Sequence, residues 1–234
     1  YPRHPAGVAA SAWTAAGLID GRLRLGIGVS HQAAMEGRLG IPWDRPARHM
    51  EEYLEILLPL LRGERVRYRG SMLSANLSLA IPPTAPCPVY LAALQPRMLQ
   101  LAGSLADGTI TWCTGPITIA EQVAPGITEA ARNAGRPAPR VVVALPVCVS
   151  DDAQHGRDVA NQLLDGYGQL PVYRAVLDRE GVQDPGDIAV VGNERAVTAQ
   201  IERLFAAGAT DFVAIPCGSD DDRRRSFDHL ASLL

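Results

Sequence analysis

The sequence contains no lysine, and all 22 of its lysine-or-arginine positions are arginine. A chain without lysine forms no Schiff base through lysine, carries no P-loop lysine and has no lysine general base. GC-rich coding is the simpler explanation of the bias. The exclusion of lysine chemistry holds whatever the origin of the bias.

Cysteines are few and scattered. Cys87, Cys113, Cys148 and Cys217 form no C-x-x-C pair and have no nearby histidine at ligand spacing. This pattern argues against a structural zinc site and against a disulfide framework. We therefore expect no bound metal, reduced thiols and a cytoplasmic location.

Long apolar runs and an excess of charge are also lacking. No run approaches the roughly 18 residues that a membrane span requires, so we expect no membrane partner. The net charge of −3 gives no reason to expect a nucleic-acid partner. With 234 residues, 47% of them hydrophobic and 20% charged, the chain has the profile of one soluble globular domain.

Strand-like and helix-like stretches alternate along the chain. Short apolar runs predict strands near residues 24–28, 89–92, 109–112, 141–149 and 212–215. Amphipathic patterns predict helices between them, at about 45–61, 98–105, 151–180 and 194–207, one that opens at Thr118, and a last helix from Ser226. This alternation is typical of a parallel α/β sheet.

Capping residues set the expected helix ends. The signals are Asp44, Pro46 and Gly63 around the 45–61 helix, the capping-box pattern Thr118-x-x-Glu121 with a kink at Pro125, and Asn193 and Gly208 around the 194–207 helix. The acidic and basic run from Asp220 to Arg225 is interpreted as a solvated loop with a capping role.

Residues 62–87 interrupt the alternation. Val66, Tyr68 and Met72 flank Arg69-Gly70, which predicts a small hairpin or looped excursion.

An open parallel sheet of five strands would leave two unpaired edges. A closed eight-stranded (β/α) barrel, a TIM barrel, needs roughly 250 residues. The sequence begins at Tyr1 without an initiator methionine. We therefore expect residues 1–234 to form a single, partial barrel domain holding strands four to eight, with strands one to three outside this chain.

An ordered series of short motifs resembles the luciferase-like monooxygenase superfamily. The series runs Gly21-Arg22-Leu23-x-Leu25-Gly26-Ile27-Gly28, Asp44-Arg45-Pro46, Glu52-Tyr53, Tyr68-Arg69-Gly70, Pro86-Cys87-Pro88-Val89, Ala92-Ala93, Ala102-Gly103, Ala106-Asp107-Gly108, Val191-Gly192 and Ala207-Gly208-Ala209-x-Asp211-Phe212. Each motif alone is weak, but their order spans nearly the whole chain. The resemblance implies the bacterial luciferase-like type of barrel.

Two further segments are most similar to the branch that uses coenzyme F420, a 5-deazaflavin. They are Trp43-Asp44-Arg45-Pro46-Ala47-Arg48-His49 and Leu170-Pro171-x-Tyr173-Arg174. The resemblance implies an oxidoreductase that transfers hydride between F420 and a small organic substrate, and we expect a homodimer. The alternatives are an FMN-dependent luciferase-like monooxygenase and a non-catalytic remnant of the fold.

Gly28, Ser30 and His31 stand where the first strand of this chain ends. Gly26-x-Gly28 lacks the third glycine of a dinucleotide fingerprint and opens into no helix, so a Rossmann site is rejected. A residue without Cβ at a strand end lets a flat ring approach the backbone; the alternative is a packing glycine. His31 is the candidate catalytic residue, as a proton donor or a hydrogen-bond partner, against the alternative of a solvated loop histidine.

Two loops are the candidate sites for the cofactor's phosphate-bearing tail. The first holds Ala92, Ala93, Leu94, Gln95 and Arg97; the second holds Cys113, Thr114 and Gly115. Free amides at helix starts attract anions, although either loop alone would be interpreted as an ordinary turn. Trp43 and Trp112 are interpreted as core or pocket wall.

Overall fold

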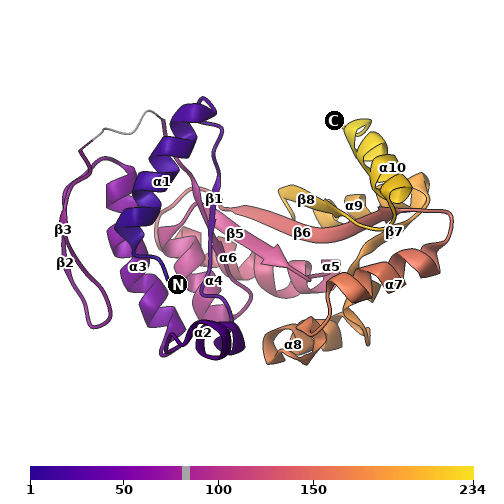
Figure 1. Cartoon of the computed structure of the whole chain (residues 1–234), viewed down its shortest axis with the longest axis horizontal. Helices are drawn as coiled ribbons and strands as arrows, with labels where there is room; N and C mark the ends of the chain where they lie inside the picture. The colour runs from indigo at the N-terminus through magenta and orange to yellow at the C-terminus, as the bar shows by residue number, and fades with distance from the viewer. Residues whose placement is uncertain (81–84) are drawn as a thin grey trace.

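A parallel sheet forms the centre of the molecule (Figure 1). The computed structural model describes residues 1–80 and 85–234. The six strands of this sheet are β1 Leu25–Ile27, β4 Val89–Ala92, β5 Gly108–Trp112, β6 Arg140–Val149, β7 Val190–Gly192 and β8 Asp211–Pro216.

The strand order confirms the prediction for the five expected strands. β1 pairs with β4, β4 with β5, β5 with β6, and β6 with β8, all in parallel. Residues Val142, Val143 and Ala144 of β6 pair with both β5 and β8, so these two strands flank β6 on opposite sides. The short β7, which pairs with the last residues of β6, was not predicted.

The sheet is open at both edges. Within residues 1–80 and 85–234, β1 pairs with β4 alone and β8 with β6 alone. The structure therefore shows a parallel α/β sheet, and the closed barrel stays an expectation.

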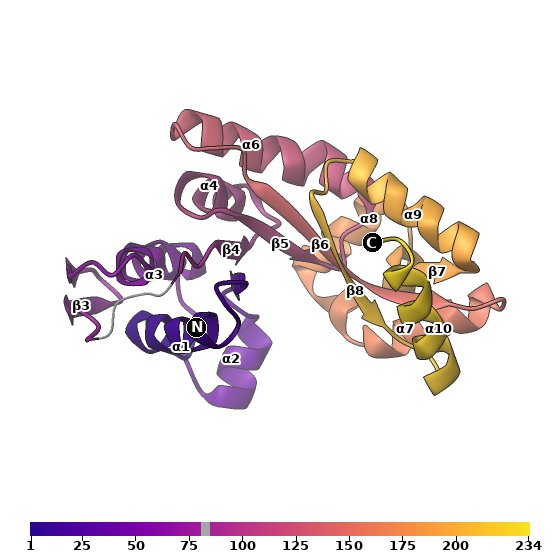
Figure 2. The same ribbon diagram turned by 90° about the horizontal axis from the view of Figure 1, so that it is seen from above.

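Helices cover the sheet. They are α1 Pro5–Leu18, α2 Gln32–Leu39, α3 Pro46–Leu61, α4 Pro96–Leu105, α5 Pro116–Thr118, α6 Ala124–Asn133, α7 Ala153–Leu163, α8 Pro171–Glu180, α9 Glu194–Ala206 and α10 Asp220–Ala231. A π-helical turn, Ile119–Val123, joins α5 to α6, and 3-10 turns lie at Tyr167–Gln169 and Pro185–Ile188. In Figure 2, α4, α6 and α9 lie along one side of the strands.

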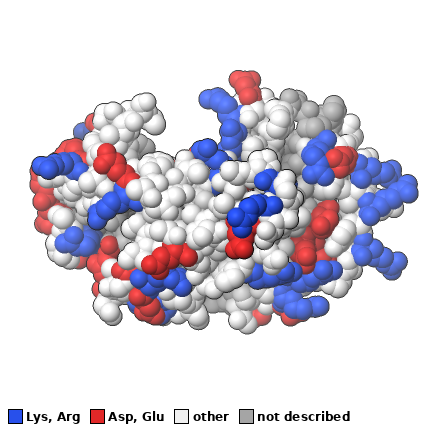
Figure 3. All heavy atoms as spheres, turned by 180° about the vertical axis from the view of Figure 1, so that it is seen from behind, with Lys and Arg blue, Asp and Glu red and all other residues white. Residues whose placement is uncertain are grey.

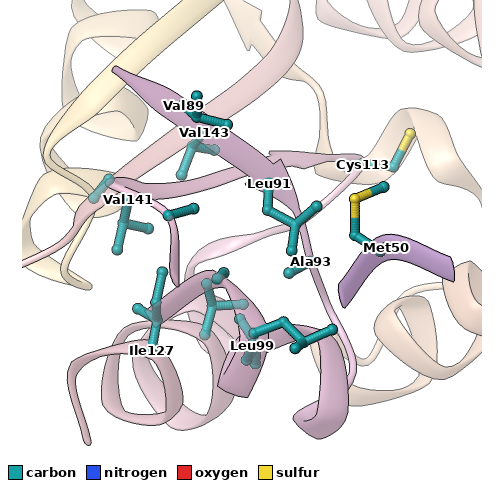
Figure 4. Close-up of a cluster of buried hydrophobic side chains, with 14 of the residues drawn as sticks. Met50, Val89, Leu91, Ala93, Leu99, Cys113, Ile127, Val141 and Val143 are labelled. Carbon is teal, nitrogen blue, oxygen red and sulfur yellow. The ribbon is translucent and has the colours of Figure 1, made fainter. Parts of the chain in front are cut away.

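The main core lies between the sheet and helices α3, α4 and α6. Figure 4 shows its apolar side chains, among them Val89 and Leu91 of β4, Leu99 of α4 and Ile127 of α6. Each such buried side chain contributes roughly 1.5–3 kcal/mol by leaving water. Gly103 lets α4 and α6 approach closely, because a Cβ on it would lie 2.5 Å from the Ile127 carbonyl oxygen. This outer layer fixes the strands whose ends carry the candidate site.

The predicted excursion contains a hairpin, β2 Val66–Arg69 and β3 Ser74–Leu77, paired antiparallel. Residues 81–84 of the excursion, including Pro82 and Pro83, lie outside the described residues. Glu52 of α3 anchors the hairpin turn, since its fully buried carboxylate accepts the Met72 and Leu73 amides at 2.9 Å each.

Two expected helix starts are wrong. Asp44 does not cap α3: its carboxylate pairs with Arg45 at 2.8 Å, and Arg45 is the N-cap residue in a left-handed conformation. Thr118 does not open a capping box, because the helix has already begun at Pro116 after the extended Gly115. Pro46, Gly63, Asn193 and Gly208 do mark helix ends, and Pro125 follows the π-helical turn.

Two longer helix predictions also need correction. The expected helix over 151–180 is divided into α7 and α8, with Gly166 in a left-handed conformation between them. The run Asp220–Arg225 is not a loop but the first half of α10. A capping box begins this helix: the Ser219 hydroxyl accepts the Asp222 amide, and the Asp222 carboxylate accepts the Ser219 amide. Three aspartates in the first turn suit the positive end of the helix dipole.

Candidate functional site

Gly28 and Ala92 lie side by side where β1 and β4 end. Ile27 is in register with Leu91, and a Cβ on Gly28 would lie 3.0 Å from the Ala92 Cβ. Gly28 is half-buried and Ala92 is exposed. The two small residues therefore leave the backbone accessible at the carboxyl ends of neighbouring strands, as a flat ligand ring requires.

Ser30 and His31 follow directly. Ser30 has φ +60°, a left-handed conformation that costs a serine energy and is typical of functional loops. The Trp43 indole donates to the Val29 carbonyl at 2.9 Å and holds this loop in place. His31 is the N-cap residue of α2, but its side chain does not cap the helix. Burial lowers the pKa of the half-buried His31, so the neutral imidazole is favoured near pH 7.

Three other aromatic rings gather around this point. His31 lies 6.2 Å from Tyr167 and 5.6 Å from Tyr173 between ring centroids, at interplanar angles of 88° and 64°. Tyr167 lies 5.1 Å from Tyr173 and 6.2 Å from Trp112. We call these four residues the strand-end cluster. Sequence reasoning missed both tyrosines, although Tyr173 stood in a motif of the resemblance and Trp112 was interpreted as core or pocket wall.

The loop after β4 is partly open. Ala93 is buried, Leu94 is half-buried, and Gln95, the N-cap residue of α4, is exposed. The Leu94 carbonyl accepts from the Gln122 side chain, which ties this loop to the segment after β5. Arg97 is exposed, but its guanidinium already lies 3.5 Å from the Glu51 carboxylate. Arg97 is therefore a partly neutralised cation near the start of α4.

The loop after β5 differs from the expected open anion site. Cys113, Thr114 and Gly115 are buried, and the Thr114 hydroxyl donates to the Trp112 carbonyl at 2.9 Å. The Glu180 carboxylate accepts the amides of Ile117 at 3.2 Å and Thr118 at 2.6 Å. A carboxylate of this chain thus occupies the helix start that a phosphate would use. Burial also raises the pKa of Cys113 to about 12, so its thiol stays protonated and is not a nucleophile.

Other surface features lie elsewhere. A cavity of about 680 Å³ lies near the amino ends of β4 and β5, lined in part by Leu58, Cys87 and Arg136. On the face in Figure 3, positive side chains gather at the edge where the hairpin lies, and both signs interleave over the rest. In the described part of the chain, no helix is long and apolar enough to span a membrane, and no three histidine, cysteine or acidic residues group as metal ligands.

The fold places this chain in the class of parallel α/β proteins, in which ligands generally bind at the carboxyl ends of the strands. The comparison with known families gives the particular group. Residues 1–221 match the family model described as luciferase-like monooxygenase. The chain belongs to this family.

Curated relatives and solved structures agree with that assignment. The 5,10-methylenetetrahydromethanopterin reductase of Methanolobus tindarius is 28% identical over 237 residues, covering 100% of this chain and 72% of that protein. The F420-dependent glucose-6-phosphate dehydrogenase of Beutenbergia cavernae is 34% identical over 191 residues, 78% of this chain and 54% of that protein. The chain thus spans about half to three quarters of these relatives.

Two solved structures share the fold. The coenzyme F420-dependent tetrahydromethanopterin reductase of Methanopyrus kandleri has a TM-score of 0.79 at 22% identity, covering 96% of this chain and 77% of that one. The oxygenating constituent of 3,6-diketocamphane monooxygenase from Pseudomonas putida, in complex with FMN, has a TM-score of 0.71 at 18% identity, covering 97% and 73%.

Proposed function

We propose that this chain is an oxidoreductase that uses coenzyme F420 to transfer hydride to or from a small organic substrate. The observation that carries the proposal is the close approach of the half-buried Gly28 to the exposed Ala92 at neighbouring strand ends, with His31 three residues further along the chain. The relatives named as F420-dependent enzymes or as methylenetetrahydromethanopterin reductases support it, since their likeness covers most of this chain.

The residues at the strand ends fit a flat cofactor ring. Gly28 and Ala92 would lie under the ring, and Ser30, His31, Leu94 and Gln95 would border it. When bound, coenzyme F420 supplies a two-electron hydride carrier. The neutral imidazole of His31 can donate or accept the proton that accompanies hydride transfer. The aromatic rings beside it leave the imidazole only half-buried, and they reduce its contact with water.

The tail would lie along the loop after β4, next to Arg97. Cys113, Thr114 and Gly115 are buried, so they support the site from behind instead of touching the cofactor directly. A phosphate at the loop after β5 would have to displace Glu180 from the Ile117 and Thr118 amides. We therefore place the tail on the β4 loop alone.

We also propose that the sheet forms part of a barrel, as the resemblance implies. The unpaired edges of β1 and β8 each offer backbone groups for a further strand. Val213 of β8 is 39% exposed, and closure would cover it. A homodimeric assembly and a cytoplasmic location belong to the same proposal.

An FMN-dependent monooxygenase is the second candidate, because an FMN-bound structure shares this fold. Both candidates are tested by titrating the protein with F420 and with FMN at the same salt concentration, following cofactor fluorescence. We expect F420 to bind at least tenfold more tightly, about 1.4 kcal/mol. FMN binding tighter by that factor would replace the F420 assignment. Binding of neither cofactor would favour the non-catalytic remnant.

A further inference from the structure

Tyr167 and Tyr173 come from a part of the chain far from His31, yet both rings reach it. His31 follows β1, Trp112 ends β5, and the two tyrosines lie in the turn Tyr167–Gln169 and in the first turn of α8. Each tyrosine ring stands steeply to the imidazole, at 88° and 64°. Edge-to-face contacts of this kind are a preferred geometry for pairs of aromatic rings.

The position of α8 is fixed at its other end. Glu180, the last residue of α8, accepts the amides of Ile117 and Thr118 in the segment that follows β5. Arg174 donates to the carbonyls of Val182 at 2.9 Å and Gln183 at 2.8 Å, which ties α8 to the loop after it. Tyr173 is therefore held beside His31 by contacts that do not involve His31.

The strand-end cluster lies at the margin of the main core: Tyr173 belongs to that core, and Trp112 and Tyr167 pack against it. Tyr173 is buried at 8% exposure, but His31, Trp112 and Tyr167 are each half-buried at the strand ends. Within residues 1–80 and 85–234, the imidazole of His31 makes no side-chain hydrogen bond. Its orientation therefore depends on the rings that surround it.

We propose that Tyr167 and Tyr173 are positioning residues that fix the orientation of the His31 imidazole just after the carboxyl end of β1, where Gly28 and Ala92 would lie against the reacting ring. The inference rests on the proposed function for the ligand, but the positioning itself concerns residues of this chain only. It gives a specific role to Tyr173 and to the turn before α8.

Burial is the cause that lowers the His31 pKa, and no charged side chain of the described residues contributes to the shift. The titratable residues whose rings contact His31 are Tyr167 and Tyr173, and the Cys113 thiol lies near Tyr173. Burial raises the pKa of both Tyr173 and Cys113, so these two groups stay protonated. His31 is then the group of the cluster whose charge changes near neutral pH.

The test follows His31 directly by NMR, with the whole 234-residue chain labelled at its five histidines and the signal assigned by comparison with His31→Gln. Tyr167→Ala removes a half-buried ring, and Tyr173→Leu removes the buried one. Tyr167→Phe and Tyr173→Phe keep both rings. Tyr68→Ala, on the distant hairpin, is the matched control.

We expect Tyr167→Ala to raise the His31 titration midpoint toward the ordinary pKa of 6.5, since water then enters. Tyr173→Leu should increase the mobility of the His31 imidazole, measured by NMR relaxation of its signals. The Phe variants should match the unsubstituted protein. F420 affinity, measured by fluorescence, should fall about fivefold or more in the Ala and Leu variants and change less than about twofold in the Phe variants.

The positioning role is overturned if Tyr167→Ala and Tyr173→Leu leave the His31 midpoint and mobility as the Tyr68→Ala control does. If the imidazole responds as expected while the unsubstituted protein binds no F420, the positioning holds and the proposed function fails. The two inferences are thereby separated.

Discussion

Glu52 and His31 are titratable side chains in two regions that treat them in opposite ways. The Glu52 carboxylate is fully buried and accepts hydrogen bonds from Ser71, Met72, Leu73 and Arg48. The His31 imidazole is half-buried among aromatic rings and, in the described residues, makes no side-chain hydrogen bond. A buried side chain whose hydrogen-bonding groups all have partners fixes the structure. A half-buried side chain without a hydrogen-bond partner is available to a ligand. The hairpin anchor should therefore govern stability, and the strand ends should govern binding.

The largest expected effect is on stability, at the anchor. Glu52→Gln removes the charge and one acceptor oxygen from a buried side chain that holds the hairpin amides, and it should lower the free energy of unfolding by about 3–5 kcal/mol. Urea unfolding at pH 7 measures this. Glu55→Gln, at an exposed position of the same helix, should change it by less than about 0.5 kcal/mol. Similar losses of unfolding free energy in the two variants would contradict the role of Glu52 as the anchor of the hairpin.

Acid should separate the two regions next. Desolvation raises the Glu52 pKa, but hydrogen bonds from Leu73, Met72 and Ser71 outweigh it and lower the pKa from 4.5 to about 2. Its contribution, about 3 kcal/mol, is therefore present above pH 4.5 and lost as the pH falls toward 2.

His31 has a lowered pKa, so the unfolded chain takes up its proton first and stability falls as the pH drops below 6.5. Glu52→Gln should flatten the stability profile only below pH 4.5, and His31→Gln only in the higher window. Unfolding free energies measured from pH 7 to 3 test both. If both variants changed stability in the same pH range, the separate titrations of Glu52 and His31 would be contradicted.

A smaller effect is expected on binding, at the strand ends. Gly28→Ala places a Cβ 3.0 Å from the Ala92 Cβ, where the ring would lie, and should weaken F420 binding about tenfold, near 1.4 kcal/mol. Gly26→Ala, on the same strand, makes only an ordinary 3.7 Å contact with Ile110 and should weaken binding less. Equal losses would place the ring elsewhere. The free energy of unfolding should change by less than about 1 kcal/mol in either variant.

The smallest effect concerns Arg97. Because Glu51 already neutralises part of its charge, Arg97→Ala should weaken F420 binding only about threefold and should flatten its salt dependence. Titrations at low and high salt measure this. Arg132→Ala, exposed on α6, should leave both quantities unchanged; an unchanged salt dependence in Arg97→Ala would remove Arg97 from the tail site.

The sheet was predictable because its strands carry local signals. Apolar runs marked all five expected strands, and their parallel order follows from the intervening helices. β7 is as short as β1 but was not predicted, because it closely follows a 3-10 turn and its residues show no alternation of apolar and polar side chains. The predictions of Asp44 and Thr118 as N-cap residues were wrong, because a capping pattern in the sequence does not show at which residue the helix begins.

The candidate site was only half predictable. Gly28, Ser30 and His31 follow a strand directly, so their position at its end could be inferred. Tyr167 and Tyr173 reach His31 only through the tertiary packing of α8, which no local pattern records. The Glu180 carboxylate accepts the Thr118 amide at the helix start after β5, although the two residues are 62 positions apart in the sequence. This contact also depends on tertiary packing, so the sequence did not reveal that a carboxylate of the chain itself occupies the expected anion site.

Hydrogen–deuterium exchange with and without F420 tests most directly the claim that the strand ends, and not the hairpin region, form the cofactor site. We expect slower exchange of amides in residues 28–31 and 92–97 when F420 is added, and no change in the hairpin, residues 66–77. Slower exchange confined to the hairpin, or to the cavity around Leu58, Cys87 and Arg136, would contradict it.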